Sequence, residues 1–269
     1  MTIFILSHNR ASNIDTLLML ERYGYNGDWY VVISDDDEQL SDYKSRVASE
    51  HLLVFNKLEI KNNIDTMYYS DKFVSKASVY ARNYILRVAR EMNLDYFIMA
   101  DDDIQKIYHR ENVDGKMKQL EINNINPILD AMQVFMECSP RICSLCPALD
   151  DAFFGGVNGN FSKGMTRQSF QFFMVNARNA RNFVGIRFED FTWSFINKDQ
   201  LFLAYWHLSF KSPKMASNRG GIDYNQTKNP HLWGLVIEPS AIKLTIDGRK
   251  RMAINSIYPM IVSDDFKKK

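Results

Sequence analysis

The stretch YFIMADDD, from Tyr96 to Asp103, decides the fold, because a short apolar run ends abruptly in three adjacent carboxylates. An apolar run of this length, bounded by charge, predicts a buried strand of an α/β sheet. Open α/β sheets bind ligands at the carboxyl ends of their strands. The three acids are therefore expected at an edge of the sheet where a ligand binds.

Two of these three carboxylates are predicted to hold a divalent cation. Side chains alternate along extended chain, so Asp101 and Asp103 are expected to face one way and Asp102 the other. Two carboxylates on one side suit Mg²⁺ or Mn²⁺, whose remaining positions stay open to phosphate oxygens and water. The alternative is a solvated turn that binds nothing.

A second apolar strand also ends in acids. The run from Trp29 to Ile33 is followed by SDDDE, residues 34–38, so both acid clusters are expected at the same edge of a parallel sheet. A first strand, Thr2 to Leu6, ends in SHNR. The predicted order is β-α-β-β-α-β, with strands over 2–6, 29–33, 52–55 and from Tyr96. The first helix begins with the S-x-x-D pattern of Ser12 and Asp15, and the second begins at Ser75.

The second half of the chain is less regular. Residues 104–125 are polar and predict an irregular surface excursion, and Asn126-Pro127 predicts a helix with Asn as its cap. Strands are expected over 171–175 and 201–208, and a short helix with an acidic first turn over 187–195. A glycine-bearing loop is expected over 147–160 and a mobile or functional loop over 209–229. A mix of helix or strand over 237–244 and a basic cluster over 249–251 complete the chain.

Composition limits the class of protein. The 269 residues are 46% apolar and 24% charged, which is typical of a soluble globular chain with a sizeable core. Lys and Arg number 33 against 32 Asp and Glu, so a net charge of +1 argues against a polyanion-binding surface over the whole protein but allows a local basic groove. No apolar run reaches the length of a membrane span, and the N-terminus reads as a strand, so a cytoplasmic protein without membrane contact is expected.

Three cysteines lie close together, at Cys138, Cys143 and Cys146. The C-x-x-C spacing suggests zinc, but the nearest fourth ligand is not at finger spacing. CSLCPAL, residues 143–149, also predicts a buried strand. Reduced core cysteines are the favoured interpretation.

Five pieces in this order resemble sugar-nucleotide glycosyltransferases of the GT-A fold. They are SHNR at 7–10, the acids at 35–37, ARN at 81–83, DDD at 101–103 and ED at 189–190. The resemblance covers about residues 2–210. It implies a single α/β domain of the GT-A type, Rossmann-like, with a mostly parallel mixed sheet flanked by helices and a C-terminal extension. Residues 1–125 would bind the sugar nucleotide, and residues 126–269 would bind the acceptor and form the extension.

The combination of ADDDI, FFGG and FEDFTWS narrows the resemblance. It is similar to bacteriophage DNA-modifying glycosyltransferases, which resemble those associated with base-hydroxylating enzymes. This implies transfer of a sugar such as glucose or arabinose from a UDP-sugar to 5-hydroxymethylcytosine in phage DNA, in the host cytoplasm, with double-stranded DNA as partner. Cations and rings available for DNA are Arg178, Arg181, Arg187, residues 249–251, Phe153, Phe154 and Trp193.

The resemblance and the residue chemistry together assign three groups of site residues. Asp190 is expected to be the general base, with Glu189 beside it. The Mg²⁺ or Mn²⁺ ligands are expected to be Asp101, Asp103 and His207. The donor-binding residues are expected to be Ser7, His8, Asn9, Arg10, Asp35, Asp36, Arg82, Asp102, Lys211, Lys214 and Arg219.

Each assignment has a plain structural alternative. His207 also fits a partly buried histidine beside Trp206, Arg82 a surface ion pair, and the lysines and arginine of 211–219 a solvated loop. Acids in the first turn of a helix favour its dipole without any other role.

Other functions also stay open. They are a glycosyltransferase acting on a glycan or small molecule, a nucleic-acid-binding module without catalysis, and a phosphatase that uses the first Asp of D-x-D as nucleophile.

Overall fold

The computed structural model describes residues 1–64, 78–114, 116–149, 161–163, 171–185, 189–197, 199–212, 242–244 and 250–252. Its elements are β1 (Thr2–Leu6), α1 (Asp15–Arg22), β2 (Asp28–Ser34), α2 (Leu40–Arg46), η1 (Ser49–His51), β3 (Leu52–Phe55), α3 (Lys57–Asn62), α4 (Ser78–Glu91), β4 (Tyr96–Asp101), β5 (Lys106–Val113), β6 (Lys116–Glu121), α5 (Asn126–Glu137), β7 (Ile142–Leu149), β8 (Phe161–Lys163), β9 (Phe172–Asn176), α6 (Glu189–Ile196), β10 (Leu201–Lys211), β11 (Ile242–Leu244) and β12 (Lys250–Met252).

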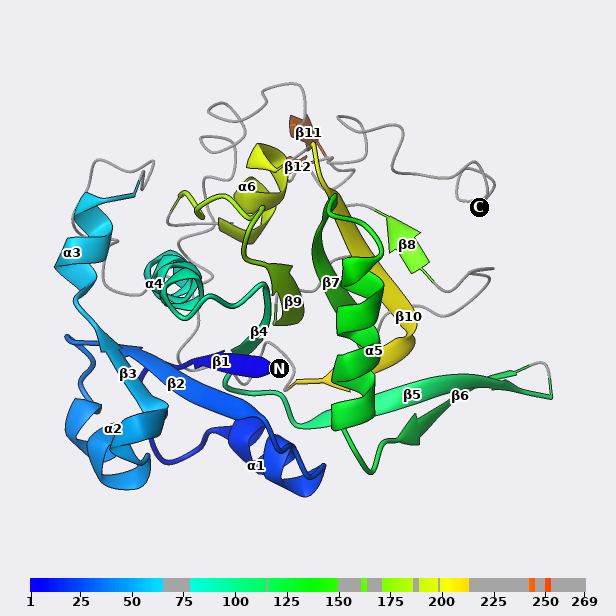
Figure 1. Ribbon diagram of the computed structural model, residues 1–269, viewed down its shortest axis with the longest axis horizontal. Helices are drawn as coiled ribbons and strands as arrows, with labels where there is room; N and C mark the ends of the chain where they lie inside the picture. The colour runs from blue at the N-terminus through cyan, green and yellow to red at the C-terminus, as the bar shows by residue number, and fades with distance from the viewer. Residues whose placement is uncertain are drawn as a thin grey trace.

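One mixed sheet organises the molecule (Figure 1). Its strands run in the order β3-β2-β1-β4-β9-β7-β10-β5-β6, and β8 pairs with β10. The strands β3, β2, β1 and β4 are all parallel. From β4 onward the pairings are antiparallel except for β7 with β10. The predicted α/β fold with a mixed sheet flanked by helices is confirmed.

Alternation along the central strands builds two cores, one on each face of the sheet. On β1, Ile3 and Ile5 face a core that includes α1 and α5, whereas Phe4 faces a core that includes α4 and α6. All three side chains are fully buried. This is the period-2 pattern of a strand covered on both faces, and it explains why these strands read as continuous apolar runs.

Several sequence predictions hold closely. The strands expected over 52–55 and 143–149 coincide with β3 and β7, and the helix with an acidic first turn coincides with α6. Cys143 and Cys146 are buried free thiols, as expected, and burial raises the pKa of Cys143. Gly24, at φ +61°, ends the first helix region in a conformation that glycine adopts without steric cost. No helix among the described residues is long and apolar enough to cross a membrane.

The prediction of an irregular excursion over 104–125 is wrong. These residues form the hairpin β5–β6, and β5 pairs with β10, for example Leu208 with His109. The partner strand lies about a hundred residues later in the chain, so local polarity gave no sign of the pairing. Cross-strand charges such as Lys106 with Glu121 (2.6 Å) accompany the hairpin.

Two predicted helix caps are also wrong. The N-cap of α1 is Ile14 and that of α5 is Ile125, and neither position has a side-chain cap hydrogen bond. Asn126 instead donates through Nδ2 to the carbonyl of Gly24 (2.7 Å). The helix start expected at Ser75, the glycine loop and most of the 209–229 and 237–251 predictions lie outside the described residues.

Candidate functional site

The acid triplet lies at the edge of the sheet where β1 and β4 end together. Leu6 is paired with Asp101 in parallel register, so the loop that follows β1 starts beside the triplet. The first turn of α1 holds the backbone of the triplet through Thr16. Thr16 N donates to the Asp102 carbonyl (3.1 Å) and Thr16 Oγ1 donates to the Asp101 carbonyl (2.5 Å). The backbone of the acid turn therefore satisfies donors of a helix start that has no side-chain cap.

Arg10 pairs with two of the three acids. Its Nη1 lies 2.5 Å from Asp102 Oδ1 and 3.3 Å from Asp103 Oδ2. Desolvation raises the pKa of Asp102 and of Asp103, and the Arg10 charge opposes that rise in both. The expectation that Asp102 faces away from Asp103 does not hold, because one guanidinium reaches both. The chain turns after β4 ends, so strand alternation no longer applies.

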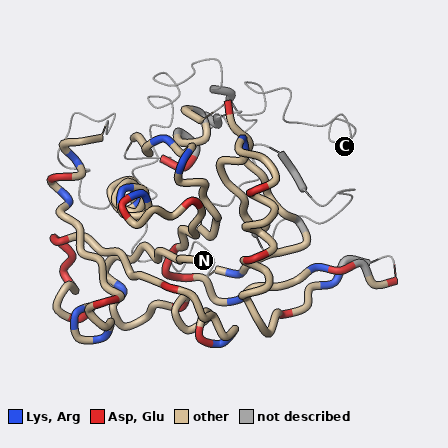
Figure 2. The backbone as a smooth tube through the Cα atoms, in the orientation of Figure 1, with Lys and Arg blue, Asp and Glu red and all other residues tan. Residues whose placement is uncertain are grey.

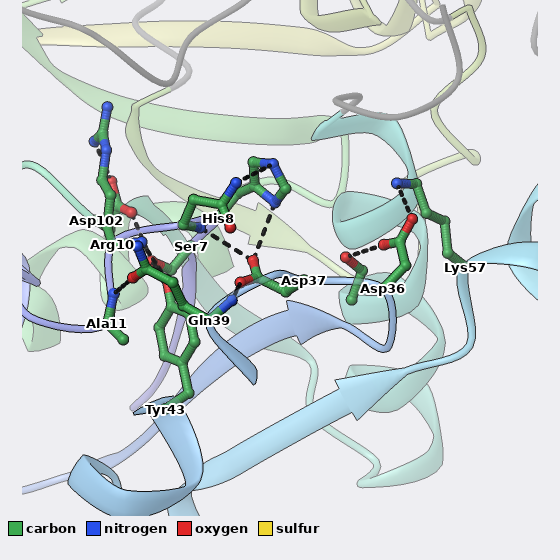
Figure 3. Close-up of polar contacts among 12 residues, drawn as sticks. Ser7, His8, Arg10, Ala11, Asp36, Asp37, Gln39, Tyr43, Lys57 and Asp102 are labelled. Carbon is green, nitrogen blue, oxygen red and sulfur yellow. Dashed lines mark hydrogen bonds and ion pairs between the residues drawn. The ribbon is translucent and has the colours of Figure 1, made fainter. Parts of the chain in front are cut away.

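A short hydrogen-bond chain supports Asp102 (Figure 3). Ser7 Oγ donates to Asp102 Oδ2 (2.6 Å) and lies 2.6 Å from the Tyr43 hydroxyl. Since the single Ser7 proton goes to the carboxylate, Tyr43 donates to Ser7. Burial raises the pKa of Tyr43 to about 12, which keeps this hydroxyl protonated. The backbone N–H of Arg10 also donates to the Tyr43 oxygen (3.0 Å).

The acids after β2 hold the other side of the same loop. Asp37 Oδ2 accepts from Asn9 N (3.0 Å) and lies 3.0 Å from His8 Nδ1. Asp37 Oδ1 accepts from Gln39 N (2.8 Å). Asn9 has φ +54°, an uncommon conformation for a residue other than glycine, and the Asp37 contact fixes it. Asp37 is thus a buried brace for the predicted donor-binding loop.

Asp35 and Asp36, both predicted to contact the nucleobase, are exposed but engaged within the protein. Asp35 Oδ1 accepts from Lys57 N (3.0 Å), and Asp36 Oδ2 pairs with Lys57 Nζ (2.7 Å). Ser34 Oγ donates to Asp36 Oδ1 (2.6 Å). Burial raises the pKa of Asp36, but the hydrogen bonds from Lys57 and Ser34 outweigh it and hold that pKa below its ordinary value.

Arg82 is buried and does not lie on the surface. Its guanidinium carbon lies 5.6 Å from the Phe173 ring centroid and 5.5 Å from that of Phe183, and its Nε is 3.7 Å from Glu189 Oε1. Ser78 Oγ also hydrogen-bonds to Glu189. Desolvation raises the pKa of Asp101 well above its ordinary value, and the Arg82 charge is the strongest opposing influence. The ion pair of Arg82 is therefore buried and not on the surface, and the predicted contact with a nucleotide stays a prediction.

The two acids of α6 differ in exposure. Glu189 is only 5% exposed and belongs to the buried pair with Arg82, so it does not fit the predicted role beside a reacting hydroxyl. Asp190 keeps intermediate exposure, and its carbonyl accepts from Ser194 Oγ (3.1 Å). Of the two, Asp190 is the more exposed acid.

Trp193 on the same helix is fully buried, with its ring stacked on Phe183 at a centroid distance of 4.4 Å. The prediction that it receives an extruded base is wrong. Its ring also contacts Phe173 and Phe202, so it belongs to the core on this face of the sheet.

His207 is not brought to the acid triplet. It lies on β10 with Nδ1 3.0 Å from the Arg110 carbonyl. Lys211, four residues further along the strand, accepts through its carbonyl from Gln105 N (2.8 Å), just beyond the triplet. Four residues of strand span about 13 Å, so His207 does not fit the predicted metal coordination. Lys214 and Arg219 lie outside the described residues.

The triplet offers part of a binding site for a divalent cation. Among the described residues, no three His, Cys, Asp or Glu side chains are grouped to hold a metal by themselves. Asp103 is 8% exposed, however, and its Oδ1 is buried without a hydrogen-bond partner in the described structure. A buried carboxylate oxygen without a partner is costly unless a ligand satisfies it. Asp103 Oδ1 therefore fits a cation ligand, and the predicted pairing with Asp101 stays a prediction.

Sequence reasoning missed three supports of this site: Thr16, Gln39 and Tyr43. Gln39 Oε1 accepts from Ala11 N (2.9 Å) and so fixes the end of the loop that follows β1. Each of the three residues lies on or beside a helix whose pattern explains it as ordinary packing. Only their contacts, those of Thr16 with the triplet and those of Gln39 and Tyr43 with the loop, reveal the role.

Comparison with known proteins identifies the class. The family model for the TET-Associated Glycosyltransferase matches residues 1–221. The chain belongs to this family and is a glycosyltransferase. The phosphatase alternative is therefore wrong. No curated protein sequence matches the chain.

Solved structures with a similar arrangement include three that are 9–10% identical to this chain. Glucosyl-3-phosphoglycerate synthase from Mycobacterium tuberculosis, in complex with Mg²⁺ and UDP, has a TM-score of 0.48 over 93% of this chain and 86% of its own. A mycobacterial protein has a TM-score of 0.48, over 96% and 88% of the two chains. A197 from STIV has a TM-score of 0.41, over 93% and 92%. All three TM-scores are below 0.5, so no function is assigned to this chain from these structures.

Proposed function

We propose that this glycosyltransferase moves a sugar from a UDP-sugar to the hydroxymethyl group of 5-hydroxymethylcytosine in double-stranded DNA, with Mg²⁺ or Mn²⁺ bound. The observation that carries the donor half of the proposal is the buried Asp103 Oδ1, which has no described partner at the sheet edge where β1 and β4 end. The acceptor half rests on the family membership, whose name joins the chain to TET enzymes.

Residues 1–125 would bind the donor. Asp101 and Asp103 would hold the cation, which when bound supplies positive charge against the developing diphosphate. The loop from Ser7 to Arg10 is held rigidly by Asp37, Tyr43 and Asp102, so its backbone is organised before the nucleotide arrives. Such preorganisation reduces the entropy that binding must overcome.

Residues 126–269 would bind the acceptor. In the transfer, the acceptor oxygen attacks the anomeric carbon while the bond from that carbon to the diphosphate breaks, and UDP leaves with the electron pair. The acceptor proton goes to the Asp190 carboxylate, which belongs to the partly exposed acid of α6. The buried Glu189 pair with Arg82 would position the helix that carries Asp190.

The base role of Asp190 has a matched test. Asp190→Asn should lower the transfer rate constant by about 10²- to 10⁴-fold, the usual contribution of a positioned acid–base group, while UDP affinity stays unchanged. Asp199→Asn, at an exposed carboxylate paired with Arg181 (2.9 Å), removes a similar charge nearby and should leave the rate unchanged. Single-turnover kinetics and calorimetry measure the two quantities. A fully active Asp190→Asn variant would remove this residue from the base role.

The acceptor is tested by mass spectrometry of synthetic duplexes. The protein is incubated with Mn²⁺, UDP-glucose or UDP-arabinose, and duplexes that differ only in carrying cytosine or 5-hydroxymethylcytosine. We expect the nucleoside from the hydroxymethylated duplex to gain one sugar and the plain duplex to stay unchanged. If the donor is consumed only with glycan or small-molecule acceptors, the DNA proposal is wrong while the glycosyltransferase assignment stands.

A further inference from the structure

The guanidinium of Arg10 stands where a charge-neutralising cation is needed. Its Nη1 lies between Asp102 Oδ1 (2.5 Å) and Asp103 Oδ2 (3.3 Å), and its side chain is 23% exposed against 7% for Asp102. Two largely buried carboxylates beside each other require a compensating positive charge. In the described structure, this side chain already supplies it.

The two ends of this contact are unequal. Asp102 is occupied on both oxygens, because Oδ1 accepts from Arg10 and Oδ2 accepts from Ser7. Asp103 has the longer contact with Arg10 on Oδ2, and its Oδ1 has no hydrogen-bond partner among the described residues. Asp102 is thus a firm anchor for Arg10, whereas the bond from Arg10 to Asp103 is the weaker one and the easier one to replace.

We propose that Arg10 is a built-in counter-cation that competes with the divalent cation for Asp103 while Asp102 retains it. This inference rests on the proposed donor site. Arg10 therefore weakens metal binding in the absence of nucleotide, both by occupying Asp103 and by repelling a second positive charge. When the cation displaces Arg10 from Asp103, the guanidinium N–H groups that are not bonded to Asp102 can bind a diphosphate, whose paired oxygens match guanidinium geometry.

This arrangement makes cation and nucleotide binding depend on each other. Without nucleotide, two positive charges at Asp103 oppose each other. With nucleotide, the diphosphate supplies the negative charge that lets both remain. We therefore expect tight Mn²⁺ binding only when UDP is present.

The test measures Mn²⁺ binding to the full chain without nucleotide. Electron paramagnetic resonance gives the concentration of the free ion and hence the dissociation constant. Arg10→Met, which keeps much of the apolar stem but removes the charge, should bind Mn²⁺ about tenfold more tightly than the wild type. Arg10→Lys keeps one charge but cannot bridge two carboxylates, so a gain of about threefold is expected. In the presence of saturating Mn²⁺, calorimetry should show Arg10→Met binding UDP more weakly than the wild type.

The matched control is Arg22→Met. Arg22 is an exposed arginine at the other end of α1, and it contacts the Gln105 carbonyl (3.3 Å) and lies 3.9 Å from Glu121. Its removal changes net charge by the same amount without touching Asp102 or Asp103, so Mn²⁺ affinity should stay within about twofold of the wild type. Circular dichroism confirms folding of each variant, and Arg10→Lys decides the matter if Arg10→Met does not fold.

The outcomes separate the two proposals. Equal or weaker Mn²⁺ binding by both Arg10 variants, with measurable binding by the wild type, overturns the counter-cation role and leaves the donor site standing. An equal gain in Arg22→Met also overturns it, because a general charge effect would then explain the result. If no variant binds Mn²⁺ with or without UDP, the proposed metal-dependent function fails together with this inference.

Discussion

Two strands of this protein end in the same three letters, and the structure treats them in opposite ways. The acids after β2 include Asp36, whose side chain is 53% exposed and whose pKa lies below its ordinary value because Lys57 and Ser34 outweigh desolvation. The acids after β4 are crowded by the protein, and desolvation raises the pKa of all three. A carboxylate run alone therefore does not define a site; burial and the surrounding charges do.

The difference follows from position in the sheet. β4 lies in the interior of the sheet between β1 and β9, whereas β2 lies next to the edge strand β3. Figure 2 shows Lys, Arg, Asp and Glu interspersed along the described part of the chain, so the contrast does not arise from a strongly charged half of the molecule. It arises from how much protein surrounds each strand end.

The largest expected effect concerns catalysis. Asp103→Asn should lower kcat/KM for transfer by about 10²- to 10³-fold. The amide would bind the divalent cation more weakly, and that cation supplies the positive charge that stabilises the leaving diphosphate. Asp36→Asn, the matched change at the other cluster, should lower it by less than about threefold, since that carboxylate is already paired with Lys57. Steady-state kinetics with saturating Mn²⁺ compares them. Equal losses in both variants would show that the two clusters do not differ in function.

An intermediate effect concerns stability. Ser7 and Ser34 each donate to one carboxylate, Asp102 or Asp36, at 2.6 Å. Ser7→Ala removes a partner from a buried acceptor and should lower the free energy of unfolding by about 1–3 kcal/mol. Ser34→Ala should cost about 0.5 kcal/mol or less, because water reaches the Asp36 carboxylate. Urea denaturation at neutral pH gives both values, and a larger loss for Ser34→Ala would contradict the assigned burial.

The smallest expected effect is a difference in pH dependence. The folded pKa of Asp36 is depressed, so its stabilisation is present above the ordinary Asp pKa of 3.8 and is lost as pH falls through the folded value. Asp36→Asn should therefore cost about 0.5 kcal/mol or less at pH 7 and nothing in strong acid.

Asp101, in the triplet after β4, is expected to change stability with pH in the opposite direction. Because the folded pKa of Asp101 is raised, its favourable contribution in metal-free protein is present below 3.8 and is lost as pH rises through the folded value. Stability curves of Asp36→Asn and Asp101→Asn against pH, each relative to the wild type, should slope in opposite directions. Parallel curves would contradict the contrast between the clusters.

How far the sequence predicted the site depended on the range of the contacts. The Ser7–Arg10 loop, the Asp101–Asp103 triplet and the order of β1 to β4 follow from local runs, and the structure brings the loop and the triplet together. The burial of Arg82 and Trp193 was not predicted, because it depends on Phe173 and Phe183, which approach from distant segments. The pairing of β5 with β10 was missed for the same reason, whereas the β5–β6 hairpin is a local pairing that the polar composition of 104–125 concealed.

The sequence alone determined that apolar strands end in carboxylates, because strand burial requires consecutive apolar residues and a charge ends such a run at the solvent boundary. It also determined the α/β class, through the alternation of strands with helices. Only the tertiary structure decided which acids of the two identical runs are buried, which oxygen of Asp103 lacks a described partner, and that Arg10 reaches Asp102 and Asp103 together. Those properties depend on neighbours brought from elsewhere in the chain, and electrostatic interactions depend on distance and surrounding dielectric rather than on residue order.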